Sequence, residues 1–162
     1  MSASEVVSLV REGQLSVGEV LEDHLARIDE VNPKLNAIVQ RTDEDSRASV
    51  RAIERRLESE PLFGATFTSK INTDHATYPT DNGVKALRDA IASVTHPSVS
   101  GLLEHGAVMV GRTNSPAFAM RFHTDNDLHG DRVAGQESLS RRGCAMSPKA
   151  TMLQDRFVGP HI

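Results

Sequence analysis

Apolar residues recur at three- and four-residue spacing near the start of the chain, and this pattern predicts two helices with one buried face each. At residues 2–5 and 16–19 a serine is followed three positions later by a glutamate, the capping box that satisfies free amides at a helix start. Gly13 is expected to end the first helix, and Asn32 with Pro33 the second, because proline disfavours helical geometry in the residue before it. The buried faces would consist of Val6, Val7, Leu9 and Val10, and of Val17, Val20, Leu21, Leu25, Ile28 and Val31.

A third stretch with helical spacing covers about residues 42–59. Thr42 and Asp45 are expected to cap the start of this helix. Its opposite face carries the arginines and glutamates of residues 47–58, which is typical of a helix surface in contact with solvent. The side chains expected to point inward are Ala48, Ala52, Ile53 and Leu57.

Short apolar runs outside these helices predict β-strands. Residues 35–39 form one candidate, and a β-prone stretch at residues 67–68 forms a second, with Lys70 at its far end. A compact apolar run at 107–110, bounded by glycines, is typical of a buried strand. Between the last two, a helix with Pro97 in its first turn is expected. A strand, a helix and another strand in this order predict a layered α/β fold.

The character of the sequence changes after Gly130. Residues 1–130 contain 13 Lys and Arg against 19 Asp and Glu, a net charge of −6, whereas residues 131–162 contain 5 against 3, a net charge of +2. Glycine, serine and proline are scattered through 131–162 without a helical or strand period. We interpret residues 1–130 as the structured portion and residues 131–162 as an irregular tail, disordered or translated out of frame.

Composition limits the classes of partner. The formal net charge of −4 argues against nucleic-acid binding, which requires a basic surface. No apolar stretch approaches the ~18–20 residues that cross a bilayer, so no membrane partner is expected. A single cysteine, Cys144, excludes an internal disulfide, and the N-terminus lacks the pattern of a secretory signal. We expect a cytoplasmic protein.

Lys70 is the main candidate for catalysis. A lysine acts as a general base only when burial lowers its pKa well below the ordinary ~10.4, so that the neutral amine can accept a proton. The end of a buried strand offers such desolvation while the amine faces a cleft. The sequence pattern alone favours an ordinary surface lysine, because lysines are mostly exposed.

A second candidate is the polar cluster at residues 123–129, which is either a metal site or the wall of a polar loop. It contains His123, Asp125, Asp127 and His129. A calcium loop that begins at Asp125 would need an oxygen ligand at position five and a glutamate at position twelve, where the chain has His129 and Gln136. No cysteine or His-x-x-x-His pattern accompanies the histidines to support zinc.

Other polar residues have ordinary structural explanations. Residues 114–116 follow the glycine-bounded strand and are either a binding loop or a plain turn. His24 lies beside an apolar helix face and is interpreted as a half-buried structural histidine. Cys144 is either a reactive thiol or a free cysteine. The strained Gly-x-Ser-x-Gly turn of serine hydrolases is absent from the sequence.

Residues 2–130 resemble the N-terminal part of amidase signature enzymes, the hydrolases that cleave carbon–nitrogen amide bonds. The resemblance lies in the paired opening helices and in blocks at residues 32–37, 62–64, 69–72, 80–83, 106–116 and 124–130. It implies an α/β/α sandwich around a mixed sheet, of which this chain would hold an incomplete N-terminal part. It also implies a Ser–cis-Ser–Lys triad in which Lys70 is the base, with no metal or organic cofactor.

The chain departs from the family pattern after Gly130. The family continues into a Gly-Gly-Ser-Ser-Gly-Gly segment that holds the bridging serine, and residues 131–162 contain no such segment. Ser69 also replaces a bulky residue beside Lys70, which weakens the expected desolvation. The resemblance therefore implies a truncated hydrolase of small-molecule amides that is inactive alone, with uncovered sheet edges that promote self-association. The alternative is a non-catalytic α/β binding module that holds a partner or a metal through residues 123–129.

Overall fold

The computed structural model describes residues 1–54 and 60–132. The predicted tail at 131–162 falls almost entirely outside this part of the chain, as do Leu57 and Cys144. No helix in the described ranges is both long enough and apolar enough to cross a bilayer. The elements, in chain order, are α1 (Ala3–Arg11), α2 (Val17–Leu35), β1 (Ile38–Gln40), α3 (Asp43–Ile53), β2 (Thr66–Lys70), η1 (Lys85–Leu87), α4 (Pro97–Glu104), β3 (Val108–Thr113) and η2 (Ala117–Ala119).

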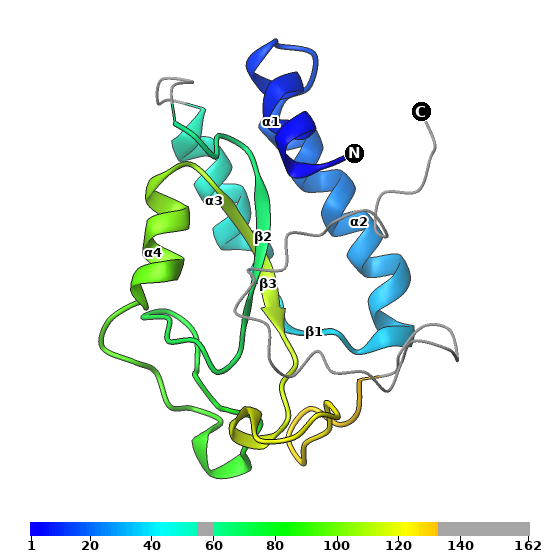
Figure 1. Cartoon of the computed structure of the whole chain (residues 1–162), viewed down its shortest axis with the longest axis vertical. Helices are drawn as coiled ribbons and strands as arrows, with labels where there is room; N and C mark the ends of the chain where they lie inside the picture. The colour runs from blue at the N-terminus through cyan, green and yellow to red at the C-terminus, as the bar shows by residue number, and fades with distance from the viewer. Residues whose placement is uncertain (55–59, 133–162) are drawn as a thin grey trace.

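A mixed three-stranded sheet lies at the centre of the molecule, with strand order β1-β3-β2 (Figure 1). β3 pairs in parallel with β2 and antiparallel with β1. The connection from β2 to β3 runs through α4, the crossover that joins parallel strands. The sequence-based prediction of an α/β fold with a mixed sheet is therefore confirmed.

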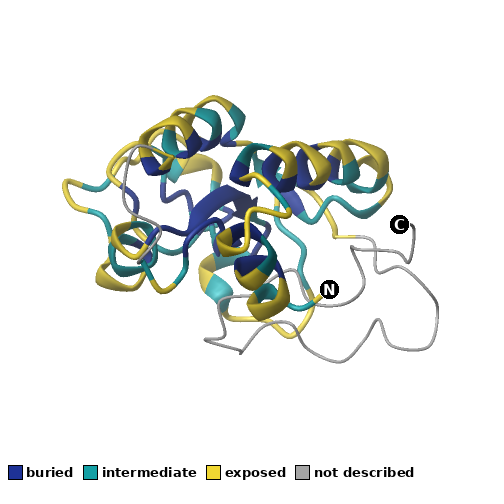
Figure 2. Cartoon of the chain, turned by 90° about the horizontal axis from the view of Figure 1, so that it is seen from above, coloured by how far each residue is buried: buried dark blue, intermediate teal, exposed yellow. Residues whose placement is uncertain are grey.

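The two faces of the sheet carry separate apolar cores, because successive side chains of β3 point in opposite directions. Val108 and Val110 pack on one face with α1, α2 and α3. Met109 packs on the other with Phe67 of β2 and Val99 of α4. Figure 2 shows the buried residues concentrated on the sheet and on the inward sides of the surrounding helices. The result is a three-layer α/β/α arrangement.

The N-terminal helices begin as the sequence predicts, but the second ends later. Both capping boxes form, at Ser2 and Ser16. α2 continues through Pro33 to Leu35, so the prediction that Asn32 and Pro33 end it is wrong. Pro33 lies in the last turn of the helix, so it interrupts only its end. The helix ends at Asn36, which is left-handed with φ 49°, and β1 therefore starts at Ile38 rather than at residue 35.

The third helix buries Ile53 as predicted, but the rest of its buried face differs from the prediction. Ala48 and Ala52 are exposed, whereas Ser46, Val50 and Ile53 are buried. The Ser46 hydroxyl donates to Met109 O at 2.6 Å, and this bond allows a polar side chain to replace alanine on the inner face. The prediction that Thr42 caps the helix is wrong, since its side chain makes no cap hydrogen bond and its hydroxyl donates to Met109 O at 2.9 Å.

Candidate active site

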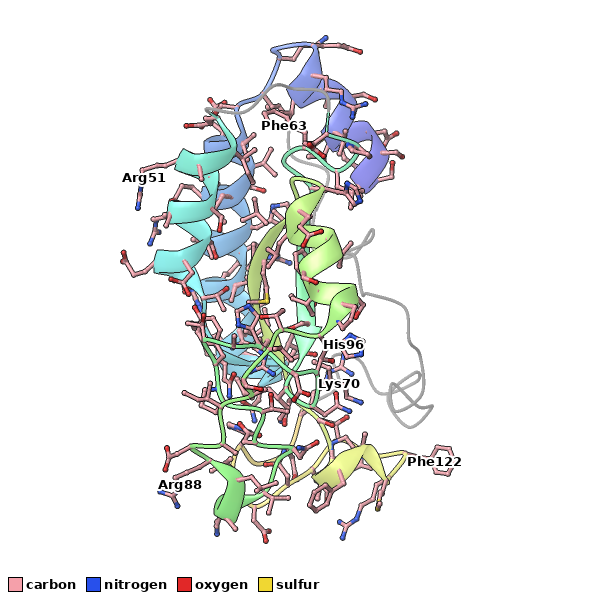
Figure 3. The ribbon with its side chains drawn as sticks, turned by 90° about the vertical axis from the view of Figure 1, so that its left-hand side faces the viewer. Arg51, Phe63, Lys70, Arg88, His96 and Phe122 are labelled. Carbon is pink, nitrogen blue, oxygen red and sulfur yellow. The ribbon has the colours of Figure 1, made fainter. Side chains whose placement is uncertain are left out.

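Lys70 is the last residue of β2 and is partly buried. It pairs with Thr113 of β3, and the next amide, that of Ile71, donates to Thr113 O at 3.1 Å. A turn follows at once, in which Thr73 N donates to Lys70 O at 2.9 Å. Figure 3 shows Lys70 at the end of the sheet that faces the long loops carrying Arg88 and Phe122. Lys70 thus stands at the end of a strand, as the sequence predicts, on the side of the molecule where these loops lie.

The strand that leads to Lys70 is buried along its length. Thr66, Phe67, Thr68 and Ser69 are all buried. The Ser69 hydroxyl donates to Met109 Sδ at 3.4 Å. Ser69 is therefore a satisfied buried side chain that occupies the position next to the lysine.

Arg112, near the end of β3, is the largest side chain in the described residues with no solvent exposure. Its Nη1 donates to Gln40 Oε1 at 2.8 Å and to Pro79 O at 2.6 Å. Its Nη2 donates to Ile71 O at 3.1 Å and to Thr73 O at 2.6 Å. Burial lowers the pKa of the Arg112 guanidinium, while the nearby carboxylates of Asp81 and Asp74 act in the opposite direction. The charge is thus held inside the protein by oxygen acceptors on three separate segments.

Asp81 is a second buried charged residue at this end of the sheet, with 1% of its surface exposed. Its carboxylate accepts from Gly83 N at 2.7 Å, and lies 2.9 Å from Gln40 Nε2 and 3.0 Å from His129 Nε2. Gln40 therefore connects Asp81 to Arg112. These contacts join β1, the turn at 81–83 and the segment that ends at His129.

Asn126 fixes the same segment against the turn. Its Nδ2 donates to Asn114 Oδ1 and to Ser115 O, both at 2.7 Å. Gly83 lies directly opposite with φ +68°, and a Cβ added there would be 2.9 Å from Asn126 Cγ. The close approach and the left-handed backbone together require glycine at this position.

The side chains of residues 123–129 do not gather into a metal site. His123 and Asp127 are exposed, and Asp125 lies 3.3 Å from Arg121. His129 is directed at Asp81 instead. Across the part of the chain that the structure describes, no three His, Cys, Asp or Glu side chains are placed to hold a metal ion. The structure does not favour the alternative of a metal-binding module.

Residues 114–116 form a buried structural turn. Asn114 Oδ1 accepts from Ser115 N at 2.8 Å, and its Nδ2 donates to Gly130 O at 3.1 Å. The Ser115 hydroxyl is fully buried and donates to Pro116 O at 3.0 Å. His24 is likewise a buried structural residue, with Nδ1 2.7 Å from Val20 O.

A hollow of about 310 Å³ lies beside the turn at 83–86 and the loops at 117–131. Its charged lining residues are Lys85, Arg121, Asp125, Asp127 and Asp131. Lys70 is not among the residues that line this hollow.

Sequence reasoning located Lys70 but missed Arg112 and Asp81. The partners of Arg112 lie 33 to 72 positions away, and Asp81 contacts Gln40 and His129 at 41 and 48 positions. One signal is present in the sequence, since Arg112 is a charged residue in a strand that is otherwise largely apolar. A charge in a buried strand requires partners, although the sequence does not say which ones.

The Amidase family model matches residues 19–133. The chain belongs to the amidase family. This amidase-family chain is 38% identical over 133 residues to the indoleacetamide hydrolase of Bradyrhizobium diazoefficiens, an alignment that covers 80% of the chain and 25% of that protein. It is 35% identical over 134 residues to the acylamidase of Rhodococcus erythropolis, covering 80% and 28%.

A solved structure with the same arrangement is that of a bacterial aryl acylamidase of the amidase signature family. The TM-score is 0.74 at 31% sequence identity, and the alignment covers 82% of this chain and 29% of that one. The amidase-family chain thus spans about a quarter of the length of the curated relatives it matches. The family resemblance and the fold inferred from the sequence are both confirmed.

Proposed function

We propose that this chain carries the general-base lysine of an amide hydrolase and that Lys70 is that residue. The observation that carries the proposal is the position of Lys70 at the carboxyl end of a buried parallel strand, inside the region matched by the family model. Ligand-binding groups in α/β sheets characteristically lie at such strand ends. The relatives named indoleacetamide hydrolase and acylamidase support an amide as the substrate class.

In the proposed reaction the neutral Lys70 amine accepts a proton from a bridging serine, which in turn takes the proton of the nucleophilic serine. The nucleophile oxygen forms a bond to the amide carbonyl carbon as its proton leaves. When the carbon–nitrogen bond breaks, Lys70 returns a proton to the bridging serine, which gives its own proton to the departing amine. Water then attacks the acyl–serine ester, losing its proton through the same path, and releases the carboxylic acid and the free serine hydroxyl. Lys70 thus acts on the substrate through the two hydroxyl groups.

We expect little or no amide turnover by the 162-residue chain alone. The resemblance implies that the bridging serine belongs to a glycine–serine segment and that the nucleophilic serine follows it, and residues 131–162 contain no such segment. Without the nucleophile and the oxyanion donors, the largest contributions to catalysis are missing. Hydrolysis of an aryl amide by the purified chain that survives Lys70→Met would remove Lys70 from the base role.

The base role is tested directly by titrating the lysine side chains. The sequence has four lysines, so their side-chain NMR signals can be assigned by single substitutions. Lys34 and Lys85 are exposed and serve as internal references. A base must give up its proton more readily than an ordinary lysine, so we expect Lys70 to titrate at lower pH than both references. A Lys70 midpoint equal to theirs would contradict the proposal.

A further inference from the structure

We propose that Arg112 is a positioning residue for Lys70, and that its buried guanidinium fixes the turn through which β2 ends. This inference rests on the base role proposed for Lys70. Arg112 acts on the lysine through the backbone of residues 71–73 rather than by touching the amine or a substrate.

Arg112 contacts the turn that follows β2 directly. Nη2 donates to Ile71 O at 3.1 Å and to Thr73 O at 2.6 Å, the carbonyls one and three residues after the lysine. From the other side, Ile71 N is bonded to Thr113 O and Thr73 N to Lys70 O. The turn is therefore held by the guanidinium as well as by the strand backbone.

The Arg112 side chain is itself held in place by hydrogen bonds on its other side. Nη1 donates to Gln40 Oε1 at 2.8 Å and to Pro79 O at 2.6 Å, and Gln40 Nε2 continues to Asp81 Oδ2 at 2.9 Å. One planar guanidinium thus connects the turn after β2 to β1 and to the loop at 79–81. Its rigid fork of donors is suited to this task, because a flexible ammonium cannot present four bonds in fixed directions.

The register of the sheet shows how Arg112 and Lys70 lie relative to each other. β3 pairs Arg112 with Ser69 and Thr113 with Lys70, so the two cationic residues are one step apart on neighbouring strands. Side chains alternate between the faces of a sheet, which places Arg112 and Lys70 on opposite faces. Any influence of Arg112 on the direction of the lysine side chain must therefore pass through the shared backbone.

The experiment compares the full chain with Arg112→Met and Arg112→Lys, using two readouts. Amide hydrogen exchange at Thr73 reports on the turn, and exchange at Leu25 and Ile28 of α2 reports on the rest of the fold. The NMR signal of the Lys70 ε-carbon reports on the surroundings of the amine. Val50→Ala is the matched control. Val50 is a buried residue of α3, and truncating its side chain lowers the free energy of unfolding of the whole fold.

We expect Arg112→Met to reduce protection at Thr73 at least tenfold more than at Leu25 and Ile28, and to shift the Lys70 signal towards those of Lys34 and Lys85. Arg112→Lys should give a smaller change in the same direction, because one ammonium replaces only part of the fork. Val50→Ala should lower protection evenly and leave the Lys70 signal unchanged. If Arg112→Met does not fold, Arg112→Lys decides by the same two readouts.

Parallel loss of protection at Thr73 and in α2, with an unchanged Lys70 signal, would show that Arg112 only stabilises the fold and would overturn the inference. The base role is judged separately. If the unmodified chain shows Lys70 titrating like Lys34 and Lys85, the proposed function fails, whereas exchange at Thr73 still reports whether Arg112 holds the turn.

Discussion

His75 is a buried titratable side chain in the loop that follows β2. It is 9% exposed and lies edge-on to Tyr78, with ring centroids 5.1 Å apart. Its Nδ1 accepts a hydrogen bond from Thr77 N at 3.1 Å. Burial lowers the pKa of His75 below its ordinary value of 6.5, and the positive charge of Arg112 lowers it further. The folded protein therefore favours the neutral ring.

This preference predicts a dependence of stability on pH. Above about pH 6.5 the ring is neutral in both the folded and unfolded states. As the pH falls below that value, the unfolded chain takes up the proton first, so the free energy of unfolding decreases until the pH passes the lower, folded-state pKa. Urea denaturation between pH 7.5 and 5 should show a smaller loss for His75→Gln than for the unmodified chain. Equal slopes for the two proteins would contradict the assignment.

At the scale of elements, signals carried by neighbouring residues were predictable and contacts between distant residues were not. The capping boxes and the proline at the start of α4 are encoded within a few positions, and both are present. The apolar run at 107–110 does lie largely in a strand, but β3 continues through Gly111 to Thr113 instead of ending before that glycine. The inner face of α3 was predicted correctly only at Ile53, and Ser46 was missed because its burial depends on a carbonyl of β3, 63 positions away. For the same reason the sequence indicated the lysine at the end of β2 but not the arginine that bonds the turn beyond it.

The capping box of α2 gives a prediction at this scale. The Ser16 hydroxyl accepts from Glu19 N at 3.1 Å, and the Ser16 amide donates to Glu19 Oε2 at 2.8 Å. Ser16→Ala removes the side-chain acceptor and should lower the free energy of unfolding by about 1 kcal/mol, as N-cap truncations typically do. Urea denaturation measures the change. Ser8→Ala, at an exposed position inside α1, is the control and should change stability by no more than about 0.5 kcal/mol.

For the whole molecule, the outer surface carries apolar side chains near the loop end. Phe118, Met120 and Phe122 are 52%, 83% and 78% exposed, and Figure 3 shows Phe122 pointing away from the protein. Phe118 also has a left-handed backbone, with φ 52°. Exposed apolar groups close together in sequence favour association. Self-association through the sheet edges stays a prediction, and we predict this loop as a second surface for it.

We expect the purified chain to associate as its concentration rises, and expect the double substitution Met120→Ser with Phe122→Ser to weaken that association. Sedimentation velocity over a wide concentration range measures both. Ile91→Ser with Val94→Ser is the matched control, since these residues are also exposed and apolar but lie in another loop. Association that is unaffected by the first pair would leave the sheet edges as the contact surface. A single monomeric species at every concentration would refute the prediction.

The order of the strands has a consequence for how the protein is made. β3 is central in the sheet but is the last of the three strands to be synthesised. While the ribosome is still adding residues before Val108, β1 and β2 have no central strand to join them, and the helices have no complete surface to cover. A nascent chain halted before Val108 should therefore remain sensitive to protease, and resistance should appear only after Thr113 has left the ribosomal tunnel.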